Sequence, residues 1–361
     1  MLATISVILV IGGLIFFHEL GHFLVARLFR VGVSKFSLGF GPKLFGFTRG
    51  KTSYQIAPVP LGGYVMLVGE QEDDEIPPGF TERESFANHP TWQKLLIIAA
   101  GPIFNLLLAW VIAWGILWHY GSTYITPEVG IVQSDSPAEK AGMLSGDVIL
   151  KIDGQPINSW EKITPIVFSS KGRTLDFELT RKTELGPVTL NLSIAPEQRQ
   201  LENMLGREYS GWVIGISPPP SVQITKVDYG FWQAAGMGLA KIWNYISAIG
   251  AFLKDVIKLD VQRDSLVGPI GIAQIIGMSA EHGLYSVLEL TIFISVNLGL
   301  LNLLPIPMLD GGHIVFYSIE MITRRKLPKT FKEAALRVGL LILLALMALA
   351  VFNDVLGLVK Q

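Results

Sequence analysis

The sequence predicts an α-helical polytopic membrane protein with four transmembrane helices, membrane-associated β-hairpins and one inserted α+β domain. Half of its 361 residues are hydrophobic and only 16% are charged, which is too apolar for an ordinary soluble protein. Each of four apolar runs is long enough to cross a bilayer, which takes roughly 20 residues. The polar stretch 121–220 separates the second run from the third.

The predicted spans divide the chain into three parts. Residues 1–120 hold two spans and the hairpins, 121–220 form the inserted domain, and 221–361 hold an amphipathic helix at the outer interface, Phe231–Leu259, and two further spans. The first run lacks a basic leading region and a small-residue cleavage site, so we expect it to be retained. The four spans are Leu2–Phe29, Leu95–Trp118, Leu290–Leu309 and Val338–Val359.

Overall charge and cysteine content exclude some functions. The formal net charge is −1, so there is no electrostatic case for nucleic-acid binding. The chain has no cysteine, which excludes disulfides and thiolate metal ligands.

The first span contains the segment His18-Glu19-Leu20-Gly21-His22. Residues four apart lie on one face of a helix, so both imidazoles can reach one metal ion. Glu19 is placed to take a proton from a metal-bound water. The alternative is a pair of core histidines beside a buried acid, but such groups are costly in a transmembrane helix unless they are used. The motif therefore predicts a metal-dependent hydrolase.

Basic residues predict the orientation of the spans. One cluster follows the first span and another precedes the fourth, which marks both loops as cytoplasmic. Both termini and the inserted domain then lie outside, and the histidines lie toward the cytoplasmic side. The clusters comprise Arg27, Arg30, Lys35, Lys43, Arg49 and Lys51, and Arg324, Arg325, Lys326, Lys329, Lys332 and Arg337.

Short strands are predicted directly after the first span, at Phe36–Pro42 and Tyr54–Pro60. Apolar strands here indicate a sheet that dips into the membrane face, where an exposed edge could pair with an extended substrate. The alternative is an ordinary cytoplasmic hairpin packed on the helices. The acidic segment Glu70–Glu84 is predicted to be a surface loop.

Polar and helix-breaking residues also interrupt the second and third spans. Gly101-Pro102 implies a kink or a close helix contact, and Asn105 needs a polar partner. The third span ends in the segment Asn302–His313, in which Pro305 and Pro307 force a break in the helix.

Asp310 is the acid at this break. It could supply a third metal ligand, leaving one position for water, or it could cap a helix with Gly311-Gly312 as the turn; we favour the ligand. His313 could be a ligand, although a structural role is favoured, and Asn302 could bind substrate backbone or pin the broken helix.

The inserted domain carries Ala-Gly, Gly-Asp and Asp-Gly steps between predicted strands and helices, and these resemble the PDZ domains of bacterial envelope proteases. One such unit is present. Trp212–Ile216 looks like the strand that lines a PDZ peptide groove, so Ile214, Gly215 and Ile216 are candidate groove residues. The alternative is a domain that only restricts access by its bulk.

Taken over nearly its whole length, the chain resembles the site-2 proteases, and specifically the bacterial RseP-like intramembrane zinc metalloproteases. The carrying segments are His18–His22, Gly39-Phe40-Gly41-Pro42, Gly101-Pro102 with Asn105, and Asn302–Gly311. The resemblance implies Zn²⁺ on His18, His22 and Asp310, and Glu19 as general base. It also implies that Asn302, Pro305 and Pro307, and the sheet around Gly39, Phe40 and Gly41, shape the substrate site.

The expected function is therefore endoproteolysis within transmembrane segments of single-span membrane proteins, in a bacterial inner membrane. The substrates implied are of the anti-sigma-factor type or signal-peptide remnants, already cut by another protease. Two alternatives are a membrane scaffold whose metal site is not catalytic, and a membrane zinc hydrolase of a non-peptide substrate. An intact Glu19 argues against the first, since structural zinc sites need no base.

Overall fold

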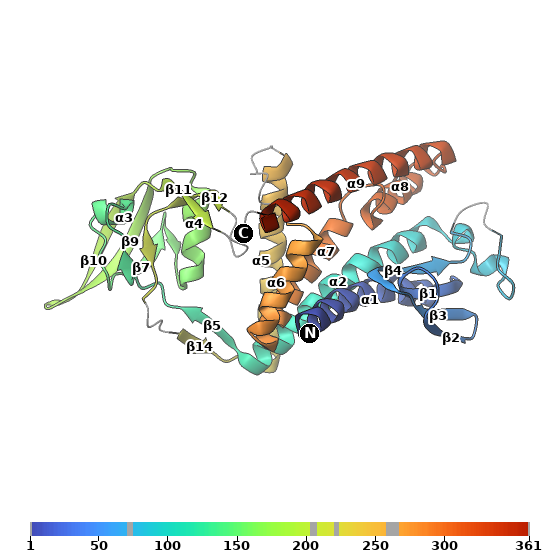
Figure 1. Ribbon diagram of the computed structural model, residues 1–361, viewed down its shortest axis with the longest axis horizontal. Coiled ribbons are helices and arrows are strands. Elements are labelled where there is room, and N and C mark those ends of the chain that lie inside the picture. The colour runs from blue at the N-terminus through green and yellow to red at the C-terminus, as the bar shows by residue number, and fades with distance from the viewer. Residues whose placement is uncertain (1, 71–74, 203–207, 220–223, 258–266, 360–361) are drawn as a thin grey trace. The chain divides into compact units, whose positions relative to one another are not determined.

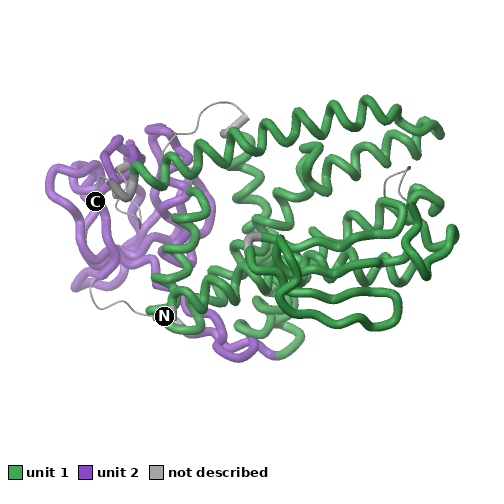
Figure 2. Tube along the Cα trace, turned by 45° about the vertical axis from the view of Figure 1, so that its right-hand side comes forward, with its two compact units in different colours: residues 1–117, 231–261, 266–360 green, residues 118–230, 262–265, 361 purple. Residues whose placement is uncertain are grey.

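The computed structural model describes residues 2–70, 75–202, 208–219, 224–257 and 267–359 (Figure 1). The chain forms two compact units, which Figure 2 distinguishes by colour. Unit 1 comprises residues 1–117, 231–261 and 266–360, and unit 2 is built from residues 118–230. The boundaries expected at 121 and 220 fall close to those of unit 2.

Unit 1 is a helical bundle with one sheet. Four of its helices are long and apolar enough to cross a membrane, as predicted. The third predicted span extends too far, because α7 ends at Asn302 and the chain turns before Pro305. The helices are α1 (Leu2–Leu28), α2 (Thr91–Tyr120), α5 (Phe231–Ile257), α6 (Pro269–Glu281), α7 (Leu284–Asn302), α8 (Asp310–Thr323) and α9 (Lys329–Val359).

The sheet of unit 1 has the strand order β2-β3-β1-β4. Strands were predicted here, but their pairing is not that of simple hairpins. β1 lies inside the sheet, parallel to β3 and antiparallel to β4. Gly39 and Phe40 therefore end an interior strand, and the two edges belong to β2 and β4. The strands are β1 (Val33–Phe40), β2 (Phe45–Arg49), β3 (Thr52–Ile56) and β4 (Val59–Leu67).

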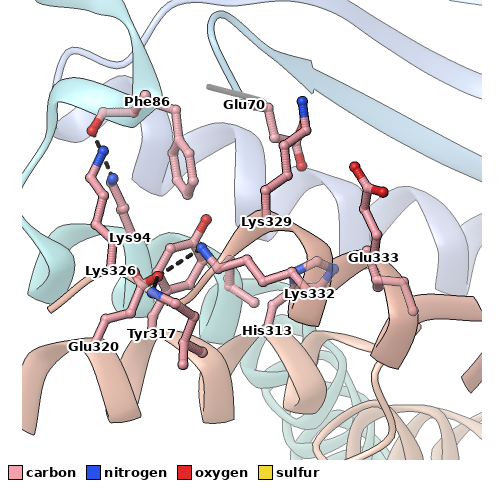
Figure 3. Close-up of a pocket in the computed structure, with 14 residues that line it drawn as sticks. Glu70, Phe86, Lys94, His313, Tyr317, Glu320, Lys326, Lys329, Lys332 and Glu333 are labelled. Atoms are coloured by element: carbon pink, nitrogen blue, oxygen red, sulfur yellow. Dashed lines mark hydrogen bonds and ion pairs between the residues drawn. The ribbon is translucent and has the colours of Figure 1, made fainter. Parts of the chain in front are cut away.

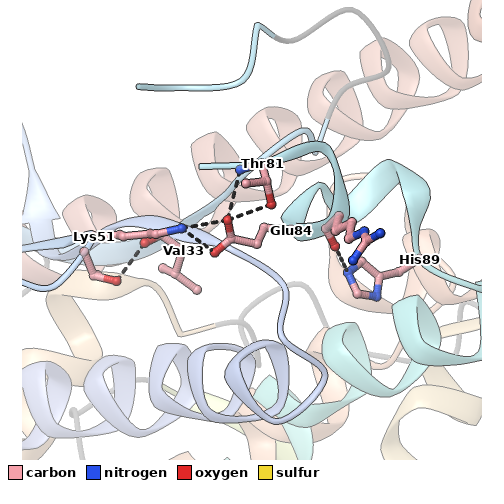
Figure 4. Close-up of polar contacts among 7 residues, drawn as sticks. Val33, Lys51, Thr81, Glu84 and His89 are labelled. Atoms are coloured by element: carbon pink, nitrogen blue, oxygen red, sulfur yellow. Dashed lines mark hydrogen bonds and ion pairs between the residues drawn. The ribbon is translucent and has the colours of Figure 1, made fainter. Parts of the chain in front are cut away.

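The segment after β4 is tied back to the sheet. Its described part contains two short 3-10 helices, η1 (Glu82–Glu84) and η2 (Phe86–Asn88). The Glu84 carboxylate accepts hydrogen bonds from Lys51 Nζ at 2.8 Å and from the Thr81 backbone amide at 2.9 Å (Figure 4). The Lys51 ammonium lowers the pKa of Glu84 below its usual value. Residues 75–84 of the predicted loop thus lead into an anchored turn, and residues 71–74 lie outside the described residues.

Small residues allow the spans of unit 1 to approach closely. A Cβ built on Gly21 of α1 would lie 2.4 Å from the Ala100 carbonyl oxygen of α2. A Cβ on Gly299 of α7 would lie 3.0 Å from the Pro102 carbonyl oxygen. Spans in lipid associate through such packing, because lipid chains are as apolar as the helices. The close helix contact predicted for the Gly101-Pro102 region is confirmed.

The amphipathic segment predicted from Phe231 forms helix α5. Its apolar face packs on α2 and α7 through a shared cluster that includes Ile242, Ala109 and Ile292. Lys241 of α5 also pairs with Glu289 of α7, with 2.6 Å between Nζ and the carboxylate oxygen. The position of α5 at a membrane interface stays a prediction.

Asp354, the one acid within the fourth predicted span, caps another helix. Its carboxylate is 1% exposed and accepts hydrogen bonds from the backbone amides of Gly268, Ile270 and Gly271. These amides belong to the start of α6, where a helix leaves its N–H groups unpaired and favours a negative charge. The buried charge therefore joins α9 to α6.

Unit 2 has a four-stranded sheet of order β10-β9-β7-β8 and a core that includes Ile149, Phe177 and Leu179. Asp147, from the predicted Gly-Asp step, is fully buried and pairs with Arg181 through two hydrogen bonds of 2.7 and 2.8 Å. The elements are β5 (Ser122–Ile125), β6 (Ile131–Val132), α3 (Pro137–Lys140), β7 (Val148–Ile152), β8 (Gln155–Pro156), η3 (Trp160–Lys162), α4 (Ile163–Ser169), β9 (Leu175–Thr183), β10 (Gly186–Ile194), β11 (Glu197–Glu202), β12 (Glu208–Val213), β13 (Ile216–Ser217) and β14 (Ile224–Val227).

The prediction of a continuous strand at Trp212–Ile216 is wrong. β12 ends at Val213 and β13 begins at Ile216, because Gly215 has a φ of +79°. The Ile214 side chain belongs to the core, and its carbonyl accepts from the Ala138 amide. A cavity of about 230 Å³ lies between this segment and α4. That a peptide binds in this cavity stays a prediction.

We expect Asp354→Ala to lower the free energy of unfolding by about 2 kcal/mol or more, because three buried amides lose a charged acceptor. Asp354→Asn is the matched control: it keeps one acceptor oxygen and should lose less. Unfolding of the detergent-solubilised protein measures both variants. Equal stability of Asp354→Ala and the parent chain would contradict this account of the α6–α9 contact.

Candidate metal centre

Three side chains from two distant parts of the chain converge within unit 1. His18 Nε2 lies 3.3 Å from His22 Nε2 and 3.2 Å from an Asp310 carboxylate oxygen. The other Asp310 oxygen lies 3.6 Å from His22 Nε2. Among the described residues these three form a group that could hold one metal ion. Tetrahedral ligands about 2.0–2.1 Å from zinc lie about 3.3 Å apart, so the donor atoms fit such an ion.

His22 is held in the tautomer that a metal requires. Its Nδ1 lies 2.9 Å from the Ile97 carbonyl oxygen. A carbonyl only accepts, so Nδ1 carries the proton and Nε2 presents its lone pair to the centre. Such a partner also orients the ring. This contact could not be predicted from the sequence, because any residue at position 97 has a carbonyl.

Asn105 does the same for His18. Its amide nitrogen lies 3.3 Å from His18 Nδ1, and its buried oxygen finds no hydrogen-bond partner among the described residues. Turning the amide over exchanges the two atoms and lets the oxygen accept the Nδ1 proton. The orphaned oxygen then has a partner, and Nε2 of His18 is left as a ligand. Asn105 was expected to need a polar partner, and its contact with His18 confirms this.

Asp310 does not cap its own helix in the structure. It is the first residue of α8, preceded by Leu309 as the capping residue, and its carboxylate lies against both histidines. The turn between α7 and α8 holds Pro305 and Pro307, as predicted, and Asn302 is the last residue of α7. His313 lies one turn further along α8 and is not in the three-residue group.

Gly101 leaves room for the two imidazoles. A Cβ built there would lie 2.2 Å from His22 Nε2 and 2.8 Å from His18 Cε1. No larger residue fits at this position unless the histidines move. The glycine is thus required by the centre itself, beyond the helix packing that the sequence indicated.

Glu19 lies beside the centre, facing the sheet. Its carboxyl group interacts with the backbone of Val65, and a Cβ on Gly63 would lie 3.1 Å from its Cγ. Both residues belong to β4, so this edge strand passes over the segment His18–His22. Sequence analysis did not predict that β4 is the strand nearest Glu19. It expected substrate contacts at Gly39, Phe40 and Gly41, and these residues lie in the neighbouring interior strand and in the turn after it.

These features define a class: a membrane protein in which a helix able to span a bilayer carries two histidines of a candidate metal centre with an adjacent carboxylate. The chain belongs to peptidase family M50, whose model matches residues 6–346. Zn²⁺ is its cofactor, and it is a zinc metalloprotease. Membership of this family favours a peptidase over the two alternatives, a membrane scaffold and a zinc hydrolase of a non-peptide substrate.

Bacterial relatives named "putative zinc metalloprotease" align with nearly the whole chain. One from Rhizobium meliloti is 35% identical, and the alignment covers 95% of this chain and 93% of the relative. One from Agrobacterium fabrum is 33% identical, covering 98% and 95%. One from Campylobacter jejuni is 35% identical, covering 97% and 92%.

Gly101→Ala should lower zinc affinity by at least about tenfold, because the new methyl group displaces both imidazoles. Gly115→Ala is the matched control on the same helix, since a Cβ there meets nothing within 4 Å. Bound zinc is measured by elemental analysis after dialysis against graded chelator, and folding by thermal unfolding. Equal zinc retention in the two folded variants would show that the close approach of Gly101 is not needed.

Proposed function

We propose that the protein is an intramembrane endopeptidase that cleaves within the transmembrane segments of single-span membrane proteins. The observation that carries the proposal is the meeting of His18, His22 and Asp310 with Glu19 alongside them. His18, Glu19 and His22 lie within a helix long and apolar enough to span a bilayer, and Asp310 follows a second such helix. Peptide bonds delivered to this centre must therefore come from within or close to the membrane.

The proposed roles follow from the geometry. His18, His22 and Asp310 hold the zinc ion through Nε2, Nε2 and the carboxylate. Bound zinc supplies a Lewis acid that acidifies water and polarises the scissile carbonyl. Glu19 takes the proton from the attacking water and returns it to the leaving amine. Ile97 and Asn105 keep the histidines in the correct tautomer.

Substrate is proposed to bind as an added strand on β4. A helical peptide bond has its carbonyl engaged in a hydrogen bond, so the substrate must be unwound before attack. The edge of β4 offers backbone groups that hold an extended segment beside Glu19, and such pairing offsets the cost of unwinding. Asn302, Pro305 and Pro307 shape the opposite side of the site. Gly39 and Phe40 at the end of the interior strand β1, and Gly41 in the turn after it, support β4.

The proposed setting is a bacterial inner membrane, with both termini and unit 2 outside and the metal centre toward the cytoplasm. Unit 2 is proposed to be the PDZ domain, restricting access to substrates that another protease has already shortened. Ile214, Gly215 and Ile216 border its cavity, where a peptide could bind.

Lysine and arginine placement supports this topology. Labelling of a single cysteine at Asp153→Cys only from outside the cell is the expected result, and labelling of Lys51→Cys only after the inner face is opened. The reverse pattern would contradict the topology.

Glu19→Gln should lower the cleavage rate of a single-span test protein by about 10²–10⁴-fold, because the general base is lost, while zinc stays bound. Cleavage is followed in detergent, and zinc by elemental analysis. Glu75→Gln, an exposed acid on the loop after β4, is the control and should cleave normally. Full activity in Glu19→Gln would refute the role; loss of zinc together with activity would indicate a ligand instead.

Asp310→Asn should weaken zinc binding and stop cleavage, since it keeps the shape but removes the charge of the third donor. His313→Ala is the comparison, because it removes the other candidate donor on α8 and should leave zinc bound. Zinc content of the two purified variants decides between them. Retention of zinc in Asp310→Asn and its loss in His313→Ala would reverse the assignment.

A further inference from the structure

A second polar site of unit 1 lies between α2, α8 and α9. A cavity of about 340 Å³ is bordered by Lys94, Tyr317, Lys332 and Leu336 among others (Figure 3). A second cavity of about 390 Å³ shares Ala87, Lys94, Glu320 and Lys326 with it. We call the two together the lysine cavity.

The lysine cavity has an excess of positive charge. Six basic and three acidic residues line it, which leaves a formal charge of +3. Part of this charge is structural: Lys332 Nζ lies 2.7 Å from the buried Glu320 carboxylate, as Figure 3 shows. The charged residues are Lys94, Arg324, Arg325, Lys326, Lys329 and Lys332, with Glu70, Glu320 and Glu333.

Lys94 sets the character of the inner wall. It is 8% exposed, donates to the Ala87 carbonyl at 2.8 Å and lies over the rings of Phe86 and Tyr317, 5.5 and 5.7 Å from their centroids. Lys94 thus places a positive charge at the inner wall, where it would attract an anion held in the cavity.

Polarity changes along the two spans that border the cavity. On α2, Lys94 is followed one turn deeper by Ile98; on α9, Lys332 is followed one turn deeper by Leu336. These candidate spans begin at Thr91 and Lys329, so the lysines lie at the headgroup level and the apolar side chains about 6 Å further into the hydrocarbon. Trp92, 49% exposed, lies at the same level, where tryptophan favours the interface.

We propose that the lysine cavity binds an anionic phospholipid, with its phosphate among the lysines and an acyl chain along Ile98 and Leu336. The charge alone would also accept free phosphate or an acidic peptide. The apolar wall one turn deeper on both spans favours a ligand with a charged head and a hydrocarbon tail. His313 lines the cavity one turn after Asp310 on α8. The bound lipid would therefore contact the helix that carries the proposed third zinc ligand.

The test measures lipid binding to the full chain in detergent. The probes are short-chain phosphatidylglycerol and phosphatidylcholine, detected as adducts by native mass spectrometry. We expect one phosphatidylglycerol per chain, bound at least tenfold more tightly than phosphatidylcholine. Lys326→Gln combined with Lys329→Gln should weaken phosphatidylglycerol binding by about tenfold or more, since the two substitutions remove two positive charges from the site.

Lys35→Gln combined with Lys43→Gln, from the other basic cluster, is the matched control and should bind as the parent does. Should the first double variant fail to fold, Arg325→Gln provides the same comparison at an exposed position. Inorganic phosphate in large excess should not displace the lipid, and Leu336→Ala should weaken lipid binding in a folded protein.

Equal binding of the two lipids, or equal loss in the control, would overturn the proposal. Displacement by inorganic phosphate would identify an anion site instead, and displacement by a soluble acidic peptide would identify a peptide site. The assay needs no cleavage and can be run on Glu19→Gln, so its failure leaves the proteolysis proposal untouched.

Discussion

The close approach of α1 and α2 is the constraint on which the metal centre depends. Where Gly21 meets the Ala100 carbonyl, the two backbones come nearer than any side chain would allow. His22 directly follows Gly21, and His18 lies about one turn earlier on α1. The same approach brings His22 to the Ile97 carbonyl and His18 to Asn105. Gly101 then leaves the space between the helices to the imidazole rings. An alanine at Gly21 or Gly101 would separate the histidines from the groups that orient them.

Polar groups in this bundle are placed where a partner satisfies them. In hydrocarbon an unpaired polar group is costly, and the spans hold few. The backbone carbonyl of Asn105 accepts a hydrogen bond from Ser295 Oγ at 2.7 Å, Lys241 pairs with Glu289, and Asp354 caps α6. The two histidines and Asp310 differ, since three metal-ligating groups are gathered and no lysine or arginine of the described residues pairs with them. These polar groups therefore fall into two kinds, contacts that join helices and the candidate metal centre.

Local periodicity predicts the parts of this molecule that are local. The four-residue spacing of His18 and His22 on an apolar run suffices to place both on one helix face. Pro305 with Pro307 indicates the break after α7, although the helix itself ends earlier, at Asn302. The contact between Asp310 and the histidines depends on how α1, α2 and α8 pack, so the sequence left a helix cap open as an alternative. The parallel pairing of β1 with β3 and the break at Gly215 were missed for the same reason, because each depends on residues distant in the sequence. In the second case the distant residue is Ser136, whose Cβ blocks any side chain at Gly215.

The position of β4 explains why a sheet belongs beside the helices of such a centre. A helix offers no free backbone groups along its length, so α1 can supply ligands and a base but cannot hold an extended peptide. A strand edge can, and Gly63 allows β4 to lie against Glu19 because it has no side chain there. The interior strand β1 fixes β4 from its other side through pairs such as Phe36 with Val65. Glu19 and the open edge are thus held together by backbone hydrogen bonds, and a substrate strand added at that edge would meet the base without any helix of the bundle having to unwind.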